Sequence, residues 1–72
     1  MTDREVLEAT IAVLGTTRIA QMVGARSPQT VQSWRVEGRV PGAWRFAMRK
    51  VANQRAGLRL PMSWLDPRKA AA

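Results

Sequence analysis

The sequence predicts a compact all-α domain of four to five short helices, and three observations support this fold class. Apolar residues recur with a helical period of about 3.6 in four stretches of the chain. Glycine, serine, threonine and proline stand between those stretches, where helices begin and end. A period-two alternation, typical of extended backbone, is confined to residues 58–62, too short to be stable alone. We therefore expect one domain over residues 1–66, with a short extended C-terminal segment, and a disordered tail over residues 67–72.

The first predicted helix follows Thr2 and ends at Gly15. Thr2 and Glu5 have the spacing of a capping box, in which each side chain accepts a hydrogen bond from the other residue's backbone amide. The acidic residues of this helix suit the positive end of its dipole and are not expected to perform chemistry. Its inward stripe, which predicts a helix packed on the core, consists of Val6, Leu7, Thr10, Ile11 and Leu14.

Two short helices joined by a tight turn are predicted between Thr16 and Gly38. Thr16 or Thr17 is the expected cap of the first helix, and Gly24 is its expected stop, because glycine adopts the left-handed conformation without steric cost. Ser27 and Pro28 are favourable residues for opening the second helix. The inward residues of the first of these helices are Ile19, Ala20 and Val23.

The predicted helix Pro28–Glu37 has two distinct faces. At about 100° per residue, Val31 and Trp34 point inward and Arg35 flanks them. The opposite side carries amides, a hydroxyl and a small apolar group, from Gln29, Gln32, Ser33 and Val36. Glutamine can pair with adenine, serine with several bases, and an aliphatic group with a thymine methyl. One interpretation is a face that contacts base edges in DNA, and the alternative is a polar face that meets solvent.

The distribution of charge favours a polyanionic partner. The net charge is +7, and Glu37 is the only acid between the acidic N-terminal stretch (Asp3, Glu5 and Glu8) and Asp66. A basic domain whose acids lie at its margins is typical of nucleic-acid-binding proteins. The basic residues of that interval are Arg18, Arg26, Arg35, Arg39, Arg45, Arg49, Lys50, Arg55 and Arg59.

A fourth helix is predicted from Pro41 to about Ala56, with Gly57 as its stop. Its inward stripe is Trp44, Ala47, Met48 and Val51, whereas Arg45, Arg49, Lys50 and Asn53 are expected at its sides and outside. Phe46 points away from Trp44, so either the chain's own tail or a partner subunit should cover it. One interpretation of the apolar tail is a dimer interface made of Phe46, Leu58, Leu60, Met62 and Trp64; the alternative is that the tail covers its own core.

Several classes of function lack the residues that they need. The chain has no histidine and no cysteine, so the commonest general base, thiolate zinc ligands and disulfides are missing. Ser27 and Ser33 have no histidine to activate them. We therefore expect neither an enzyme nor a metal or cofactor site. No apolar run reaches membrane-spanning length and the acidic N-terminus does not resemble a secretory signal, which predicts a cytoplasmic protein.

The order of these residues resembles small phage-type helix-turn-helix regulators of the Cro/repressor class. The pattern is Ile19-Ala20, Val23-Gly24, a turn, Thr30 to Arg35, and Gly38 to Pro41, and the likeness covers about residues 7–56. In that family the first helix has a small alanine, which Ala20 matches, and the turn has a glycine, which Gly24 matches. The recognition helix has an aliphatic anchor, which Val31 matches, and Trp34 looks like its second anchor. Two departures are a turn longer by one residue and Thr16-Thr17 where many relatives have a phosphate-binding glutamine.

The resemblance implies a sequence-specific DNA-binding regulator, a repressor of the phage or prophage type that binds a palindromic operator as a homodimer. Base contacts are expected from Pro28, Gln29, Gln32, Ser33 and Val36. Phosphate contacts are expected from Thr16, Thr17, Arg18, Arg26, Ser27, Arg35 and Arg39. A second hypothesis keeps the fold as a protein-interaction module, an antitoxin-like protein or a polymerase adaptor, with DNA binding secondary or absent. A third takes residues 41–56 as a basic amphipathic helix on a membrane or in a calmodulin-like groove.

Overall fold

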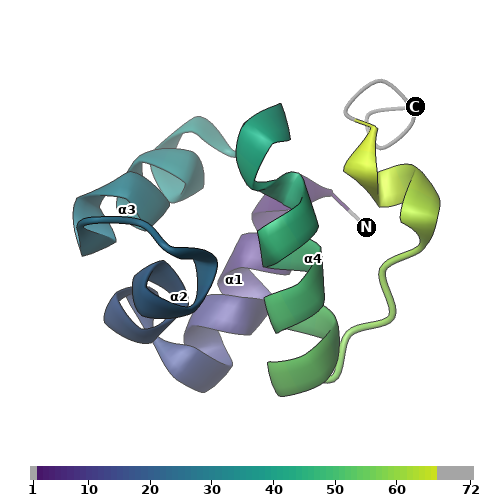
Figure 1. Ribbon diagram of the computed structural model, residues 1–72, viewed down its shortest axis with the longest axis horizontal. Helices are drawn as coiled ribbons and strands as arrows, with labels where there is room; N and C mark the ends of the chain where they lie inside the picture. Colours follow the sequence, from purple (N-terminus) through teal and green to yellow (C-terminus); the bar gives the residue numbers. More distant parts are fainter. Residues whose placement is uncertain (1, 67–72) are drawn as a thin grey trace.

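The computed structural model describes residues 2–66, which form an all-α domain without any strand in that range (Figure 1). The radius of gyration is 10.7 Å, close to the value of about 11 Å expected for a compact domain of this length. The predicted fold class is therefore confirmed as all-α, with four α-helices and a short 3₁₀ helix. The elements are α1 (Asp3–Leu14), α2 (Thr16–Val23), α3 (Pro28–Glu37), α4 (Gly42–Arg55) and η1 (Met62–Leu65).

Helix α1 begins with the predicted capping box. The Thr2 backbone N–H donates to Oε1 of Glu5 at 2.9 Å, and the Glu5 N–H donates to the Thr2 hydroxyl at 3.2 Å. The hydrogen bond from the Thr2 backbone amide stabilises the carboxylate and lowers the pKa of Glu5 below its ordinary value of 4.5. The capping residues thus fix where the chain becomes helical.

The turn between α2 and α3 follows the prediction at both of its ends. Gly24 has φ of 83° and ψ of 19°, the left-handed conformation that ends α2. Ser27 caps α3, because its hydroxyl accepts the Gln29 N–H at 3.1 Å, and Pro28 follows as the first helical residue. The expected cap of α2 is wrong: Gly15 occupies the cap position, no side chain caps the helix, and Thr16 already lies inside it.

The core lies between α1, α2, α3 and α4. Val31 and Trp34 attach α3 to it, and Trp34 packs against Trp44 of α4 with ring centroids 5.5 Å apart and planes tilted by 48°. Ala20 is buried on α2, which packs against α3. The buried apolar residues are Val6, Leu7, Ile19, Ala20, Val23, Val31, Trp34, Val40, Met48, Val51, Ala52, Leu60 and Trp64.

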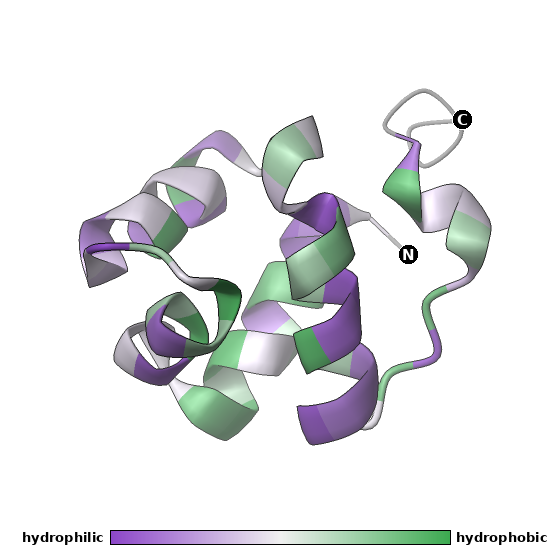
Figure 2. Cartoon of the chain, in the orientation of Figure 1, coloured by the Kyte–Doolittle hydropathy of each residue, from purple (hydrophilic) through white to green (hydrophobic). Residues whose placement is uncertain are grey.

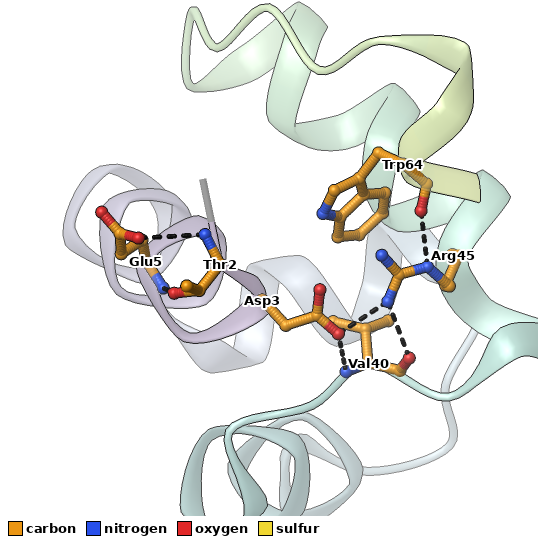
Figure 3. A network of polar contacts seen from close by, with 6 residues as sticks. All are labelled: Thr2, Asp3, Glu5, Val40, Arg45 and Trp64. Carbon is orange, nitrogen blue, oxygen red and sulfur yellow. Dashed lines mark hydrogen bonds and ion pairs between the residues drawn. The ribbon is translucent and has the colours of Figure 1, made fainter. Parts of the chain in front are cut away.

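Arg45 is buried, contrary to the expectation that it lies at the side or outside of its helix. It is 1% exposed and connects three distant segments (Figure 3). Its Nη1 donates to Oδ2 of Asp3 at 2.6 Å and to the Val40 carbonyl at 3.2 Å, and its Nε donates to the Trp64 carbonyl at 2.6 Å. The guanidinium also lies over the Trp64 ring, 3.9 Å from the centroid. Asp3 accepts the Val40 N–H as well, at 2.9 Å, so the chain leaving α3 is held to the start of α1.

The C-terminal segment packs against its own subunit. Leu60 and Trp64 are buried and Leu58 packs on the core, which is the alternative that the sequence left open. Asn53 holds the segment, because its side chain accepts the Leu60 N–H at 2.8 Å and donates to the Leu60 carbonyl at 3.3 Å. Residues 58–61 have no regular secondary structure, and Met62, which was expected to continue the extended segment, instead begins η1. The predicted tail, residues 67–72, lies outside the described residues.

Candidate nucleic-acid interface

The side of α3 that faces away from the core carries the five residues expected to contact bases. We call it the outward face of α3, and it consists of Pro28, Gln29, Gln32, Ser33 and Val36. All five are exposed, and Val36, an aliphatic residue, is 79% exposed. Figure 1 places α3 at the opposite end of the molecule from η1, and Figure 2 shows a mainly hydrophilic ribbon along it. The inward anchors of α3 therefore leave its polar side free.

The amide side chains of the outward face are available for a ligand. Among the described residues, no hydrogen bond uses the side-chain amide of Gln29 or Gln32. The Ser33 hydroxyl donates to the Gln29 carbonyl at 3.0 Å, so its lone pairs can still accept a hydrogen bond. The two glutamines lie three residues apart on one face of the helix, a spacing that suits contacts with neighbouring base pairs.

The N-terminus of α2, a helix that packs against α3, offers a second set of polar groups. No side chain caps this helix, so the backbone amides of Thr16, Thr17 and Arg18 have no side-chain partner. Thr17 and Arg18 are exposed and Thr16 is half-buried. Free amides at a helix start bind phosphate, and a threonine hydroxyl and a guanidinium beside them add further donors.

The cations expected to contact phosphates differ in whether a carboxylate of the same chain already pairs with them. Arg26 in the turn and Arg39 after α3 are exposed, and no carboxylate within residues 2–66 pairs with either of them. Arg35 instead forms an ion pair with Glu8 of α1, with Nε and Oε1 3.0 Å apart. No local pattern around Arg35 indicates this partner, because Glu8 lies on another helix. Ser27 caps α3 by accepting the Gln29 N–H, so its own O–H is still free to donate to a phosphate.

The residues expected at a dimer interface divide into two groups. Leu60 and Trp64 lie in the subunit's own core and Leu58 is half-buried there. Phe46 and Met62 are 66% and 64% exposed. Of the predicted set, these two are available to a partner in the isolated subunit.

Other kinds of site find little support in the described part of the chain. Within residues 2–66, no three acidic, histidine or cysteine side chains come together as metal ligands would. No single helix there is long and apolar enough to cross a membrane, although α1 and α2, bent by 105°, would suffice together by length and composition.

Comparison of the chain with protein-family models, characterised proteins and solved structures gives no match. Its function is therefore inferred from its own residues and their geometry.

Proposed function

We propose that this protein is a sequence-specific DNA-binding regulator of the Cro/repressor helix-turn-helix class that inserts α3 into the major groove. The observation that carries this proposal is the division of α3 into two buried anchors and an outward face with two unpaired glutamine amides. The start of α2 and the exposed cations Arg26 and Arg39 would hold the flanking phosphates. Phosphate contacts supply affinity and register, whereas the outward face of α3 supplies sequence specificity.

The regulator would act as a homodimer on a palindromic operator and would repress by occupying a promoter. Two recognition helices of such dimers lie one turn of DNA apart, about 34 Å. The longest dimension of this subunit is 29 Å, so two adjacent copies can span that distance. A second copy would also supplement the small core of a 72-residue chain.

The test separates base contacts from phosphate contacts by comparing Gln32→Ala with Arg39→Ala. Loss of the Gln32 amide should cost about 1–3 kcal/mol on the cognate operator and little on random DNA, because the amide would contact a base edge. Loss of the Arg39 cation should weaken both complexes alike and reduce the slope of log K against log salt by about 0.9. Anisotropy titrations of both variants at two salt concentrations measure these effects. Equal losses on both DNAs for Gln32→Ala would contradict the assignment.

A second candidate function is a protein-interaction module on the same fold, with DNA binding secondary. The exposed side chain of Phe46 favours it. Retention on heparin that disappears with modest salt, together with no protected sequence on the protein's own promoter, would support this candidate against the first.

A further inference from the structure

Helices α2 and α4 form a groove that the proposed DNA contacts do not use. Its volume is about 380 Å³, within the range of about 300–1,000 Å³ typical of ligand pockets. The apolar part of its lining comes from Met22, Phe46 and Val51, and the polar part from Lys50, Gln54 and Arg55. No residue of α3 lines it, so the outward face of α3 and this groove are separate surfaces.

The positive charges of the groove are not neutralised within the described chain. No acidic residue lines the groove, and neither Lys50 nor Arg55 has a carboxylate partner among residues 2–66. At about 100° per residue, Ala47, Val51 and Gln54 lie between these two cations on α4, and Phe46 lies on the outer side of Lys50. A surface that combines apolar side chains with two unpaired cations is complementary to a helix that combines an apolar stripe with acidic flanks.

We propose that this groove binds an amphipathic helix of a second protein, with acidic residues on both sides of its apolar stripe. The span from Phe46 to Arg55 is about 14 Å at 1.5 Å per residue. That length accommodates apolar anchors spaced i, i+4 and i+7, the usual spacing for a helix in a groove. Phe46 and Met22 would contact the anchors, while Lys50 and Arg55 would pair with the flanking carboxylates and fix the orientation.

A second copy of this chain fits the groove poorly. A two-fold contact through it would bring Lys50 and Arg55 of both copies together, and like charges oppose such a contact. The three acids of α1 already have partners in their own subunit, because Asp3 pairs with Arg45, Glu8 pairs with Arg35 and Glu5 accepts the Thr2 N–H. The proposal therefore assigns Phe46 to a different partner and leaves Met62 for the dimer.

A panel of synthetic helical peptides tests the proposal on the full-length protein. Each labelled peptide has about five turns, leucines at i, i+4 and i+7, and glutamates on both flanks. One control peptide has the same composition with the leucines scrambled, and another has lysines in place of the glutamates. We expect a micromolar complex with the acidic peptide by fluorescence anisotropy and no comparable complex with either control.

Matched variants locate the binding surface. Phe46→Ala should lower the affinity for the acidic peptide by about tenfold or more. Met62→Ala, which truncates a side chain of similar exposure outside the groove, should leave that affinity unchanged. Lys50→Glu should weaken it, whereas Arg59→Glu, which makes the same charge change at an exposed position outside the lining, should have little effect. Circular dichroism would establish that all four variants are folded.

Several results would overturn the proposal. These are equal binding of the scrambled peptide, equal losses for Lys50→Glu and Arg59→Glu, or no binding of any acidic peptide at about 1 mM. A change of oligomeric state in Phe46→Ala would assign the groove to a second copy. Binding of anionic vesicles that Lys50→Glu abolishes, without peptide binding, would assign it to a membrane. Because α3 is unaltered in these variants, operator affinity measured in parallel tests the proposed DNA binding separately.

Discussion

Replacing Arg45 by methionine should destabilise the domain strongly, although the substitution removes a charge from a very basic protein. Arg45 is 1% exposed and connects Asp3, the Val40 carbonyl and the Trp64 carbonyl. Removing one member of a buried ion pair costs about 3–5 kcal/mol. Asp3 retains 14% side-chain exposure and the Val40 N–H, so we expect the lower end, about 3 kcal/mol.

That loss is large for a domain of this size. Stabilities of about 0.05–0.15 kcal/mol per residue give about 4–11 kcal/mol for the whole chain. A loss of about 3 kcal/mol should lower the melting temperature by about 12–24 °C. Urea unfolding followed by tryptophan fluorescence and circular dichroism measures the free energy directly, and Trp64, which stacks on Arg45, contributes to the fluorescence signal.

The matched control is Arg59→Met, at an exposed arginine for which a change within about 0.5 kcal/mol is expected. Combining Arg45→Met with Asp3→Asn in a double-mutant cycle should give a coupling energy of at least about 1 kcal/mol, because the two side chains are in direct contact. An Arg45→Met protein as stable as Arg59→Met, or additive effects in the cycle, would refute the network as a stabilising element.

Three further predictions concern the turn, the first cap and the ion pair beside α3. Gly24→Ala should cost about 1–2 kcal/mol by thermal unfolding, because an alanine at φ of 83° is strained even though its Cβ meets no atom within 4 Å. Gly42→Ala, at a helical glycine without positive φ, should instead stabilise the domain by about 0.4–1 kcal/mol. A stability change of the same sign in Gly24→Ala and Gly42→Ala would contradict this explanation. The pKa of Glu5 is lowered in the folded state, so the ionised Glu5 carboxylate stabilises the fold above pH 4.5. This contribution is lost as the pH falls through the lowered pKa. The stability difference between wild type and Glu5→Gln should therefore shrink in urea titrations below that pH, and a constant difference would argue against the cap. Glu8→Gln should change stability by less than about 1 kcal/mol, since the pair is exposed, yet tighten binding to random DNA by releasing Arg35. Unchanged affinity at low salt would exclude Arg35 from the phosphate contacts.

Local features of the fold were predictable because residues close in sequence determine them. Ser27 and Gly24 mark the ends of α3 and α2 through capping and a left-handed turn, and both expectations are confirmed. The periodicity of α3 correctly separated its buried anchors, Val31 and Trp34, from its exposed side.

Features that depend on distant residues were not predictable. Arg45 sits among other cations on α4, a pattern that indicates a solvated side, and its partner Asp3 is 42 residues away. Alternation of apolar residues in the tail predicts burial but does not show whether the residues are covered by their own subunit or by a partner. Leu60 and Trp64 were therefore compatible with either, and the structure buries both in their own subunit. The groove likewise needs Met22 of α2 beside α4, which no local pattern specifies.

Selection of bound sequences from a random DNA pool tests most directly whether the outward face of α3 contacts base pairs. Wild-type protein should enrich a palindrome whose half-sites are centred about 10 base pairs apart, and the Gln29→Ala, Gln32→Ala double variant should lose that preference while still binding DNA at low salt. A wild-type protein that binds DNA but enriches no sequence, or a double variant that enriches the same one, would contradict the proposed function.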